Sequence, residues 1–225
     1  MKKIVAMSVC VGFALQLSAG TDTLFSKKDT YARAAVPMAD YGKIIEVMFW
    51  QQGSRVIMEY DLSGIKGTVT GATLKFRMAN NIDKNWNVEV FPMVYTKNNY
   101  SWKEGTGQTF QESAAASGAA CYALRDASKS APWEDASGSA VANITASGLW
   151  DKQIGQEKGT DWAKGKFVTV TLDAETVERY RKEYGTIVLG LWDQAMAGAA
   201  NGFTITTREA AVAGNRPVLT IISAP

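Results

Sequence analysis

The sequence predicts an all-β fold, a jelly-roll-like antiparallel β-sandwich, and three observations support it. Short segments rich in β-branched and aromatic residues recur along the chain, with turn residues between them. Several of these segments alternate apolar and polar side chains, as half-buried strands do. Only one segment has a helical pattern, and nothing repeats at the spacing typical of solenoids or propellers.

Eight segments are expected to form strands. They are 44–50, 55–62, 72–78, 87–95, 167–172, 186–192, 202–206 and 217–222. In segment 55–62, Val56 and Met58 alternate with Arg55 and Glu59, so one face is expected to join the core and the other to meet water. Segment 186–192 is apolar on both faces, which predicts a central strand beneath a second layer.

One short helix is expected at 174–184. Asp173 precedes it and can accept hydrogen bonds from the first-turn amides, and Gly185 follows it and can adopt the left-handed conformation that ends a helix. Val177 and Tyr180 fall on one face of the helix, together with Tyr184. We therefore expect one helix packed on the β-sandwich.

Residues 112–148 are expected to form a long Ala/Ser/Gly-rich loop. Ala, Ser and Gly make up 22 of the 37 residues, and no period is sustained across them. Loops of this length are uncommon in compact domains and are usually either functional or mobile. This excursion is expected to leave the sandwich and return to it.

Residues 1–20 have the pattern of a secretory signal peptide, which leaves 21–225 as a single β-sandwich domain. Lys2 and Lys3 precede an apolar run that is short for a transmembrane span, and small residues close the segment before Thr21. A membrane anchor is the alternative interpretation. The short basic start suggests a bacterial protein that is secreted, whether extracellular, periplasmic or on the cell surface. After cleavage Cys121 is the one remaining cysteine, so no intramolecular disulfide is expected.

Charge and composition exclude several function classes. Without the two signal lysines the chain has 22 basic and 22 acidic residues, so nucleic acid and anionic membranes are not expected as partners. No membrane insertion is expected after the signal is removed. The chain contains no histidine, which excludes Ser-His-Asp catalysis and histidine-ligated zinc.

Several motifs together resemble a known family. They are Asp29-Thr30-Tyr31, Asp40-Tyr41-Gly42, Ser54-Arg55 leading through residues 59–63 to Ala72-Thr73-Leu74, Ser101-Trp102-Lys103-Glu104-Gly105, Phe203 to Thr207 with Arg208-Glu209, and Arg216-Pro217-Val218-Leu219. In this order they resemble the DNRLRE-type domain, grouped with carbohydrate-binding module family 96, over about residues 29–222. The resemblance implies a secreted jelly-roll-like sandwich that accompanies polysaccharide-acting enzymes and binds glycans without cleaving them. The motif residues themselves are expected to be mainly structural, with Arg208 and Glu209 as a charge pair that holds the last hairpin.

The candidate glycan site lies at one end of the sandwich. If the first four predicted strands alternate in direction, the turns at 51–54 and 79–86 lie at the same end. Trp50 and Trp86 would then share one rim, where a flat ring offers sugars an apolar face. Polar groups in these turns could bind hydroxyls: Gln51, Gln52, Asn81, Asp83 and Lys84. The alternative is that Trp50 and Trp86 are ordinary buried side chains that fill space at the ends of two hairpins.

Other tryptophans are secondary candidates. Trp133, Trp150 and Trp162 flank the excursion and could either bind a glycan or pin the loop to the sandwich. Trp102 and Trp192 are expected in the core.

No catalytic residue and no metal ligand is assigned. Glu134 and Asp135 are the most suggestive acids, although adjacent acids in such a loop are usually solvated. A structural calcium ion could be bound by Asp22, Asp29 and Asp40, although no calcium-loop motif is present and no cofactor is required. The sequence thus favours a non-catalytic polysaccharide-binding protein with possible companion enzymes. The alternatives are a structural or adhesive surface protein and a histidine-free polysaccharide lyase or hydrolase.

Overall fold

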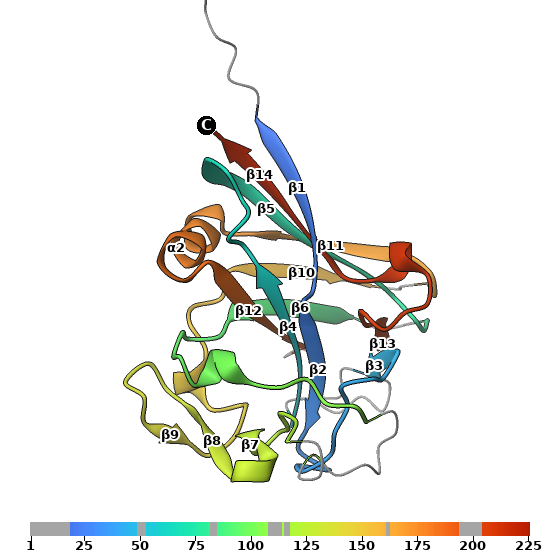
Figure 1. The fold of residues 1–225 in the computed structure, drawn as a ribbon. Helices are drawn as coiled ribbons and strands as arrows, with labels where there is room; N and C mark the ends of the chain where they lie inside the picture. Colours follow the sequence, from blue (N-terminus) through green and yellow to red (C-terminus); the bar gives the residue numbers. More distant parts are fainter. Residues whose placement is uncertain are drawn as a thin grey trace, which may run out of the picture.

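The computed structural model describes residues 19–48, 53–81, 85–107, 114, 118–160, 163–193 and 204–225. Nine of the described strands form one antiparallel sheet in the order β1-β14-β5-β11-β10-β6-β12-β4-β2. The sheet curls around an apolar interior, and smaller elements cover part of its outer face (Figure 1). The predicted all-β, sandwich-like fold is confirmed.

The strands of the large sheet are β1 (Gly20–Phe25), β2 (Lys28–Arg33), β4 (Ser54–Asp61), β5 (Thr68–Arg77), β6 (Trp86–Pro92), β10 (Gly155–Gly159), β11 (Phe167–Leu172), β12 (Thr186–Asp193) and β14 (Val218–Ala224). Two smaller sheets consist of β3 (Glu46–Met48) with β13 (Thr204–Thr206), and of β7 (Leu124–Asp126), β8 (Ala131–Glu134) and β9 (Ala140–Val141). Each of the eight segments predicted as strands overlaps one of these strands.

The consecutive strands β1 and β2 form the two opposite edges of the large sheet. β1 pairs with β14 at one edge, and β2 pairs with β4 at the other. Between them, the Lys27 amide donates a 2.7 Å hydrogen bond to the Glu59 carbonyl of β4. The chain itself therefore joins the two edges, which explains why the sheet curls instead of lying open (Figure 1).

The main core lies on the concave side of the sheet. Inward-facing side chains from neighbouring strands are fully buried there, among them Met58, Leu74, Phe76 and Leu189. β12 lies between β6 and β4, and its opposite face packs into a second apolar cluster through Val188 and Trp192. The prediction of a central strand beneath a second layer is confirmed.

The outer face of β4 differs from the sequence prediction. It was expected to meet water, yet Arg55, Ile57 and Glu59 are all buried. The segment between β6 and β10 covers this face, and the charges are satisfied beneath it. The Lys28 ammonium lies 2.6 Å from the Glu59 carboxylate, and the Arg55 guanidinium lies 4.1 Å from the Trp192 ring centroid. Charged residues alternating with apolar ones were therefore a misleading sign of solvent exposure here.

The excursion at 112–148 is more ordered in its described part than a plain loop. It contains β7, β8 and β9, which lie together beside the large sheet (Figure 1). Trp133 and Ile144 are fully buried in the second cluster, to which Ile57 of β4 also belongs. A few large apolar side chains therefore anchor a segment whose composition is otherwise dominated by small residues.

The predicted helix is confirmed as α2 (Ala174–Tyr184). The Asp173 carboxylate accepts a 3.2 Å hydrogen bond from the Glu175 amide at its start. Gly185 ends the helix in the left-handed conformation, at φ 69°. Val177 and Tyr180 are buried in the main core, so the helix packs on the sheet through the predicted face.

The predicted signal segment, residues 1–20, lies almost wholly outside the described residues, and β1 begins at Gly20. Within the described part of the chain, no helix combines the length and apolar character that crossing a membrane requires. The Cys121 thiol is buried and free. Signal cleavage and secretion therefore stay predictions.

Candidate functional site

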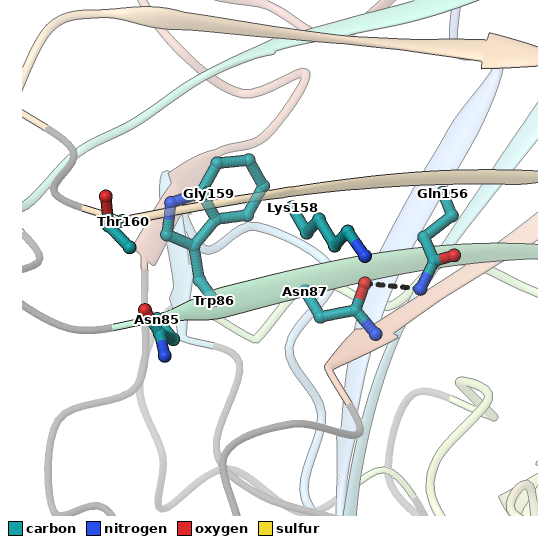
Figure 2. Close-up of a pocket in the computed structure, with 7 residues that line it drawn as sticks. All are labelled: Asn85, Trp86, Asn87, Gln156, Lys158, Gly159 and Thr160. Carbon is teal, nitrogen blue, oxygen red and sulfur yellow. Dashed lines mark hydrogen bonds between the residues drawn. The ribbon is translucent and has the colours of Figure 1, made fainter.

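A groove crosses the ends of β6 and β10. Its volume is about 460 Å³, and it is lined by Asn85, Trp86, Asn87, Gln156, Lys158, Gly159 and Thr160. Two paired strands supply nearly the whole lining, because Lys158 lies directly opposite Asn87 and Gly159 directly opposite Trp86 (Figure 2). Regular sheet pairing thus holds the polar side chains at fixed positions along the groove.

Trp86 contributes a buried ring to this groove. Its side chain belongs to the main core, and the residue is only 3% exposed. Gly159 allows this arrangement, because a Cβ atom at that position would lie 2.8 Å from the indole Cζ2 atom. The Trp86 ring is therefore packed in the core and does not offer a ligand a broad stacking face.

The polar lining is organised by hydrogen bonds. The Gln156 Nε2 amide donates to Asn87 Oδ1 at 2.6 Å (Figure 2). Asn87 Nδ2 in turn donates to Glu89 Oε1 at 3.2 Å. Lys158 is exposed beside these amides and brings a positive charge. Amide oxygens, amide N–H groups and an ammonium are the groups that can bind sugar hydroxyls or carboxylates.

The structure describes only part of the predicted rim. Trp50, Gln51, Gln52, Asp83, Lys84 and the secondary candidate Trp162 lie outside the described residues. The predicted topology does hold for the flanking strands, because β4 and β6 run in the same direction and β5 runs oppositely. The start of β4, the end of β5 and the start of β6 therefore mark the same end of the sheet, next to the groove lined by Trp86.

Asn81 is placed, and it has a structural contact. Its Oδ1 atom accepts a 2.7 Å hydrogen bond from the Lys164 amide, in the turn before β11. Neighbouring Asn80 accepts a 2.7 Å hydrogen bond from the Thr204 amide through its own Oδ1 atom. These two amides join chain segments at this end of the sheet, and neither belongs to the groove lining.

The secondary candidates Trp133 and Trp150 are both buried, at 0% and 9% exposure. The Trp133 indole N–H donates to the Cys121 carbonyl at 3.1 Å, and that of Trp150 donates to the Ile144 carbonyl at 2.7 Å. Both rings therefore pin the excursion to the sandwich, which was one of the two roles considered for them. Trp102 and Trp192 are also buried, as expected.

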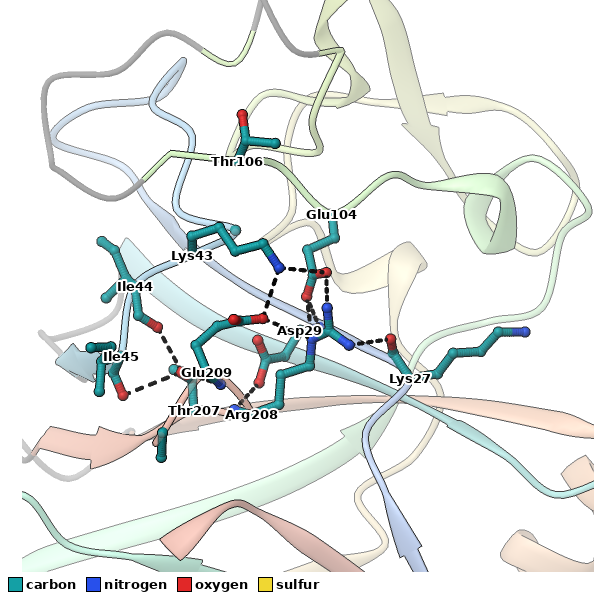
Figure 3. Close-up of polar contacts among 12 residues, drawn as sticks. Lys27, Asp29, Lys43, Ile44, Ile45, Glu104, Thr106, Thr207, Arg208 and Glu209 are labelled. Carbon is teal, nitrogen blue, oxygen red and sulfur yellow. Dashed lines mark hydrogen bonds and ion pairs between the residues drawn. The ribbon is translucent and has the colours of Figure 1, made fainter. Parts of the chain in front are cut away.

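Motif residues that are distant in sequence meet in one polar cluster. The guanidinium of Arg208 donates two hydrogen bonds to the Glu104 carboxylate, and the Asp29 amide donates a third at 2.9 Å (Figure 3). The Lys43 ammonium lies 2.9 Å from Glu209 and 3.8 Å from Glu104. Arg208 Nε is 3.2 Å from Glu209, so the predicted charge pair exists, but Glu104 is the main partner of Arg208.

Asp29 is the buried carboxyl group of this cluster. Its Oδ2 atom accepts a 2.7 Å hydrogen bond from the Arg208 amide. Burial raises its pKa to about 7; that hydrogen bond opposes the rise, and the nearby Glu104 charge adds to it. The cluster joins β2 to the segments that contain Glu104 and Arg208, and its groups bond to one another.

Asp40 explains the glycines of the family-like motifs. Its Oδ1 atom accepts from the Gly42 amide at 3.0 Å, and its Oδ2 atom accepts from the Thr106 amide at 3.0 Å. A Cβ atom on Gly105 would lie 1.6 Å from Asp40 Oδ1. Two motifs of the resemblance therefore fit together through backbone contacts that only glycine allows.

Other acidic candidates have structural contacts. Glu134 accepts from Thr96 at 3.1 Å and from Asn98 at 2.8 Å, and Asp135 caps the following turn through the Ser137 amide at 2.8 Å. Hydrogen bonds from Ser137 lower the pKa of Asp135. Within the described residues no three acidic or cysteine side chains gather as metal ligands would. The expected calcium site stays a prediction.

The polar half of the groove was not predicted from the sequence. Asn87, Gln156 and Lys158 were not singled out, because β10 has the sequence GQEKG and lacks the β-branched residues that indicate a strand. The sequence carries no alternation there, because Gln156, Glu157 and Lys158 are all polar, and their places on the two faces follow only from the pairing of β10 with β6.

No model of a known protein family matches the chain, and no curated protein matches it either. The resemblance to the DNRLRE-type domain therefore remains a prediction from the motifs.

Proposed function

We propose that the chain is an exported, non-catalytic glycan-binding β-sandwich whose binding site is the groove across β6 and β10. The supporting observation is that Asn87, Gln156 and Lys158 lie on two paired strands and line one groove together with Trp86. Sugars present many hydroxyls, so they can bind where amides and an ammonium group are held at fixed positions.

Binding is favoured over cleavage by the chemistry of the lining. Glycoside hydrolysis needs two carboxyl groups facing each other across the sugar. The groove residues are amides, a hydroxyl, a lysine, a glycine and a tryptophan, and none of them is acidic. Glu89 lies beside the groove but is only 8% exposed and is hydrogen-bonded to Asn87. A ligand would therefore be held by hydrogen bonds and released unchanged.

The proposed function also includes export from the cytoplasm and binding of polysaccharides outside it. Residues 1–20 would act as the signal peptide, and the chain beginning at Thr21 would meet polysaccharides outside the cytoplasm, alone or beside carbohydrate-active enzymes. The balance of 22 acidic and 22 basic residues in that chain leaves recognition to local contacts.

Affinity electrophoresis against neutral and acidic polysaccharides tests the proposal. The chain from Thr21 should be retarded by at least one polymer, and Gln156→Ala and Lys158→Ala should each weaken retardation by about 3- to 10-fold, the effect of one lost hydrogen bond. Gln153→Ala and Lys97→Ala are matched controls, because both residues are exposed and lie outside the groove. No retardation by any polymer, or equal loss in the controls, would show that the proposal is wrong.

A further inference from the structure

Glu89 lies behind the proposed groove. It is in the middle of β6, directly opposite Gln156 of β10 on one side and Trp192 of β12 on the other. The residue is only 8% exposed and does not line the groove. It reaches the lining through Asn87, two residues earlier on the same face of the strand.

The hydrogen bonds from the groove to Glu89 run in one direction. Gln156 Nε2 donates to Asn87 Oδ1 at 2.6 Å, and Asn87 Nδ2 donates to Glu89 Oε1 at 3.2 Å. A carboxylate can only accept, so the NH₂ group of Asn87 must face Glu89 and its carbonyl must face Gln156. The NH₂ group of Gln156 then faces Asn87, and its carbonyl oxygen points away from Asn87 (Figure 2).

We infer that Glu89 is a positioning residue that fixes the donor and acceptor pattern of the groove, an inference that rests on the proposed function. The carboxylate orients Asn87, and Asn87 orients Gln156. The groove therefore offers an acceptor at Gln156 Oε1 and a donor at the Lys158 ammonium. This pattern selects glycans that place a free hydroxyl donor at Gln156 and an oxygen acceptor at Lys158.

A purely structural role for Glu89 makes a different prediction. Burial lowers the pKa of Arg55 to about 10, and the negative charge of Glu89 is one of the interactions that oppose this shift, so the two groups attract each other. If Glu89 only balanced Arg55, removing its charge would weaken folding, and no change at Asn87 would compensate. Substituting Glu89 and Asn87 together distinguishes the positioning role from charge balance with Arg55.

The test compares Glu89→Gln with the double variant Glu89→Gln/Asn87→Asp. In the single variant the new amide at position 89 can donate as well as accept, so position 89 no longer dictates which end of the Asn87 amide faces it. In the double variant that amide donates to the new carboxylate at position 87. The carboxylate also accepts from Gln156, which restores the orientation of Gln156.

The double variant keeps the net charge of the parent, so a difference between the double variant and the parent does not come from total charge. Asn87→Ala breaks the same series of hydrogen bonds without altering Glu89 or Arg55. It takes the place of the single variant if Glu89→Gln fails to fold.

The first measurement needs no glycan. In NMR spectra of the free protein, the Gln156 side-chain amide resonances should shift in Glu89→Gln and in Asn87→Ala and return toward the parent positions in the double variant. An unchanged Gln156 resonance in Glu89→Gln, or in Asn87→Ala should Glu89→Gln not fold, would overturn the inference. So would a double variant as altered as the single one.

The second measurement uses the polysaccharide that retards the parent most strongly, before and after O-methylation. Methylation removes the hydroxyl groups from which Gln156 Oε1 would accept hydrogen bonds. The parent should prefer the native polymer, and Glu89→Gln should reduce that preference by about 3- to 10-fold. The double variant should recover it, and equal preference in the single and double variants would contradict the inference. A parent that binds no polymer defeats the proposed function, while the NMR result still decides the role of Glu89.

Discussion

The guanidinium of Arg208 binds both oxygens of the Glu104 carboxylate, with Nε 2.7 Å from Oε1, although the residues are 104 positions apart. The same carboxylate accepts from the Asp29 amide (Figure 3). Three family-like motifs from the start, middle and end of the domain therefore share one ion pair. The motifs describe how the sandwich is closed, and the groove across β6 and β10 is a separate feature.

Glu104→Gln should lower the free energy of unfolding by about 2–4 kcal/mol, because it removes the main charged partner of the partly buried Arg208 and leaves Glu209 as its ion-pair partner. Urea unfolding at pH 7 measures the loss. The control is Lys182→Ala, which removes an ion pair between the exposed Lys182 and Glu178 on the helix and should cost about 0.5 kcal/mol or less. Equal losses in the two variants would mean that the cluster does not stabilise the fold.

Stability should depend on pH through Asp29. Its pKa is about 7 in the folded protein, above the ordinary value of 3.8, mainly because of burial. Both states are neutral at this carboxyl below pH 3.8, and above about pH 7 the folded state bears the cost of the buried charge. Unfolding free energy should therefore fall by a few kcal/mol as pH rises through this window. Asp29→Asn should flatten that decline in melts between about pH 4.5 and 8, and an unchanged decline would contradict the assignment.

Glu178 has the opposite effect at lower pH. Hydrogen bonds from Arg181 lower its pKa to about 2, below the ordinary 4.5. Its contribution is present above pH 4.5 and is lost as pH falls toward 2. Glu178→Gln should therefore reduce the acid-side loss, as measured by urea unfolding between about pH 2 and 5. If the variant leaves the acid side of the pH profile unchanged, other groups determine it.

Gly159→Ala should destabilise the protein by about 1–3 kcal/mol, because the new methyl group would overlap the buried Trp86 ring. The matched control is Gly64→Ala, where nothing lies within 4 Å of the added Cβ. Differential scanning calorimetry should show a clearly lower melting temperature only for Gly159→Ala. A normal melting temperature would mean that Trp86 is not packed against β10.

Trp133→Ala should cost about 3–5 kcal/mol, since it removes a fully buried ring and its hydrogen bond to Cys121. It should also speed limited proteolysis within 112–148, because the excursion loses its anchor. Ser137→Ala, in an exposed turn of the same excursion, is the control. If Trp133→Ala is cleaved as slowly as the parent, the excursion is held by other contacts.

The strand pattern of the sheet could largely be predicted from local sequence. Segments such as 167–172 alternate cleanly and match β11 at both ends. β10 could not be predicted, because two glycines flank three polar residues. β1 and β2 were also missed, since their short polar-rich sequences form strands only by pairing with β14 and β4. Edge and partner strands depend on tertiary contacts that local periodicity does not contain.

The candidate site was predictable only in part. Trp86 was identified from topology, and the structure places it beside the groove, but as a buried ring. The groove depends on which strand pairs with β6, and that strand is β10, far along the chain. Likewise, Arg208 was paired with its neighbour Glu209, whereas its main partner Glu104 is distant in sequence. Long-range pairings of this kind cannot be deduced from one local pattern.

The most direct test of the proposed site is an NMR titration of the isotope-labelled chain from Thr21. The titrant is an oligosaccharide fragment of the polymer that retards it. Glycan binding in the groove predicts that shift changes concentrate at Asn85–Asn87 and Gln156–Thr160 and are small at the Arg208 cluster. Changes that concentrate elsewhere, with Gln156 and Lys158 unperturbed at saturation, would contradict the proposed site.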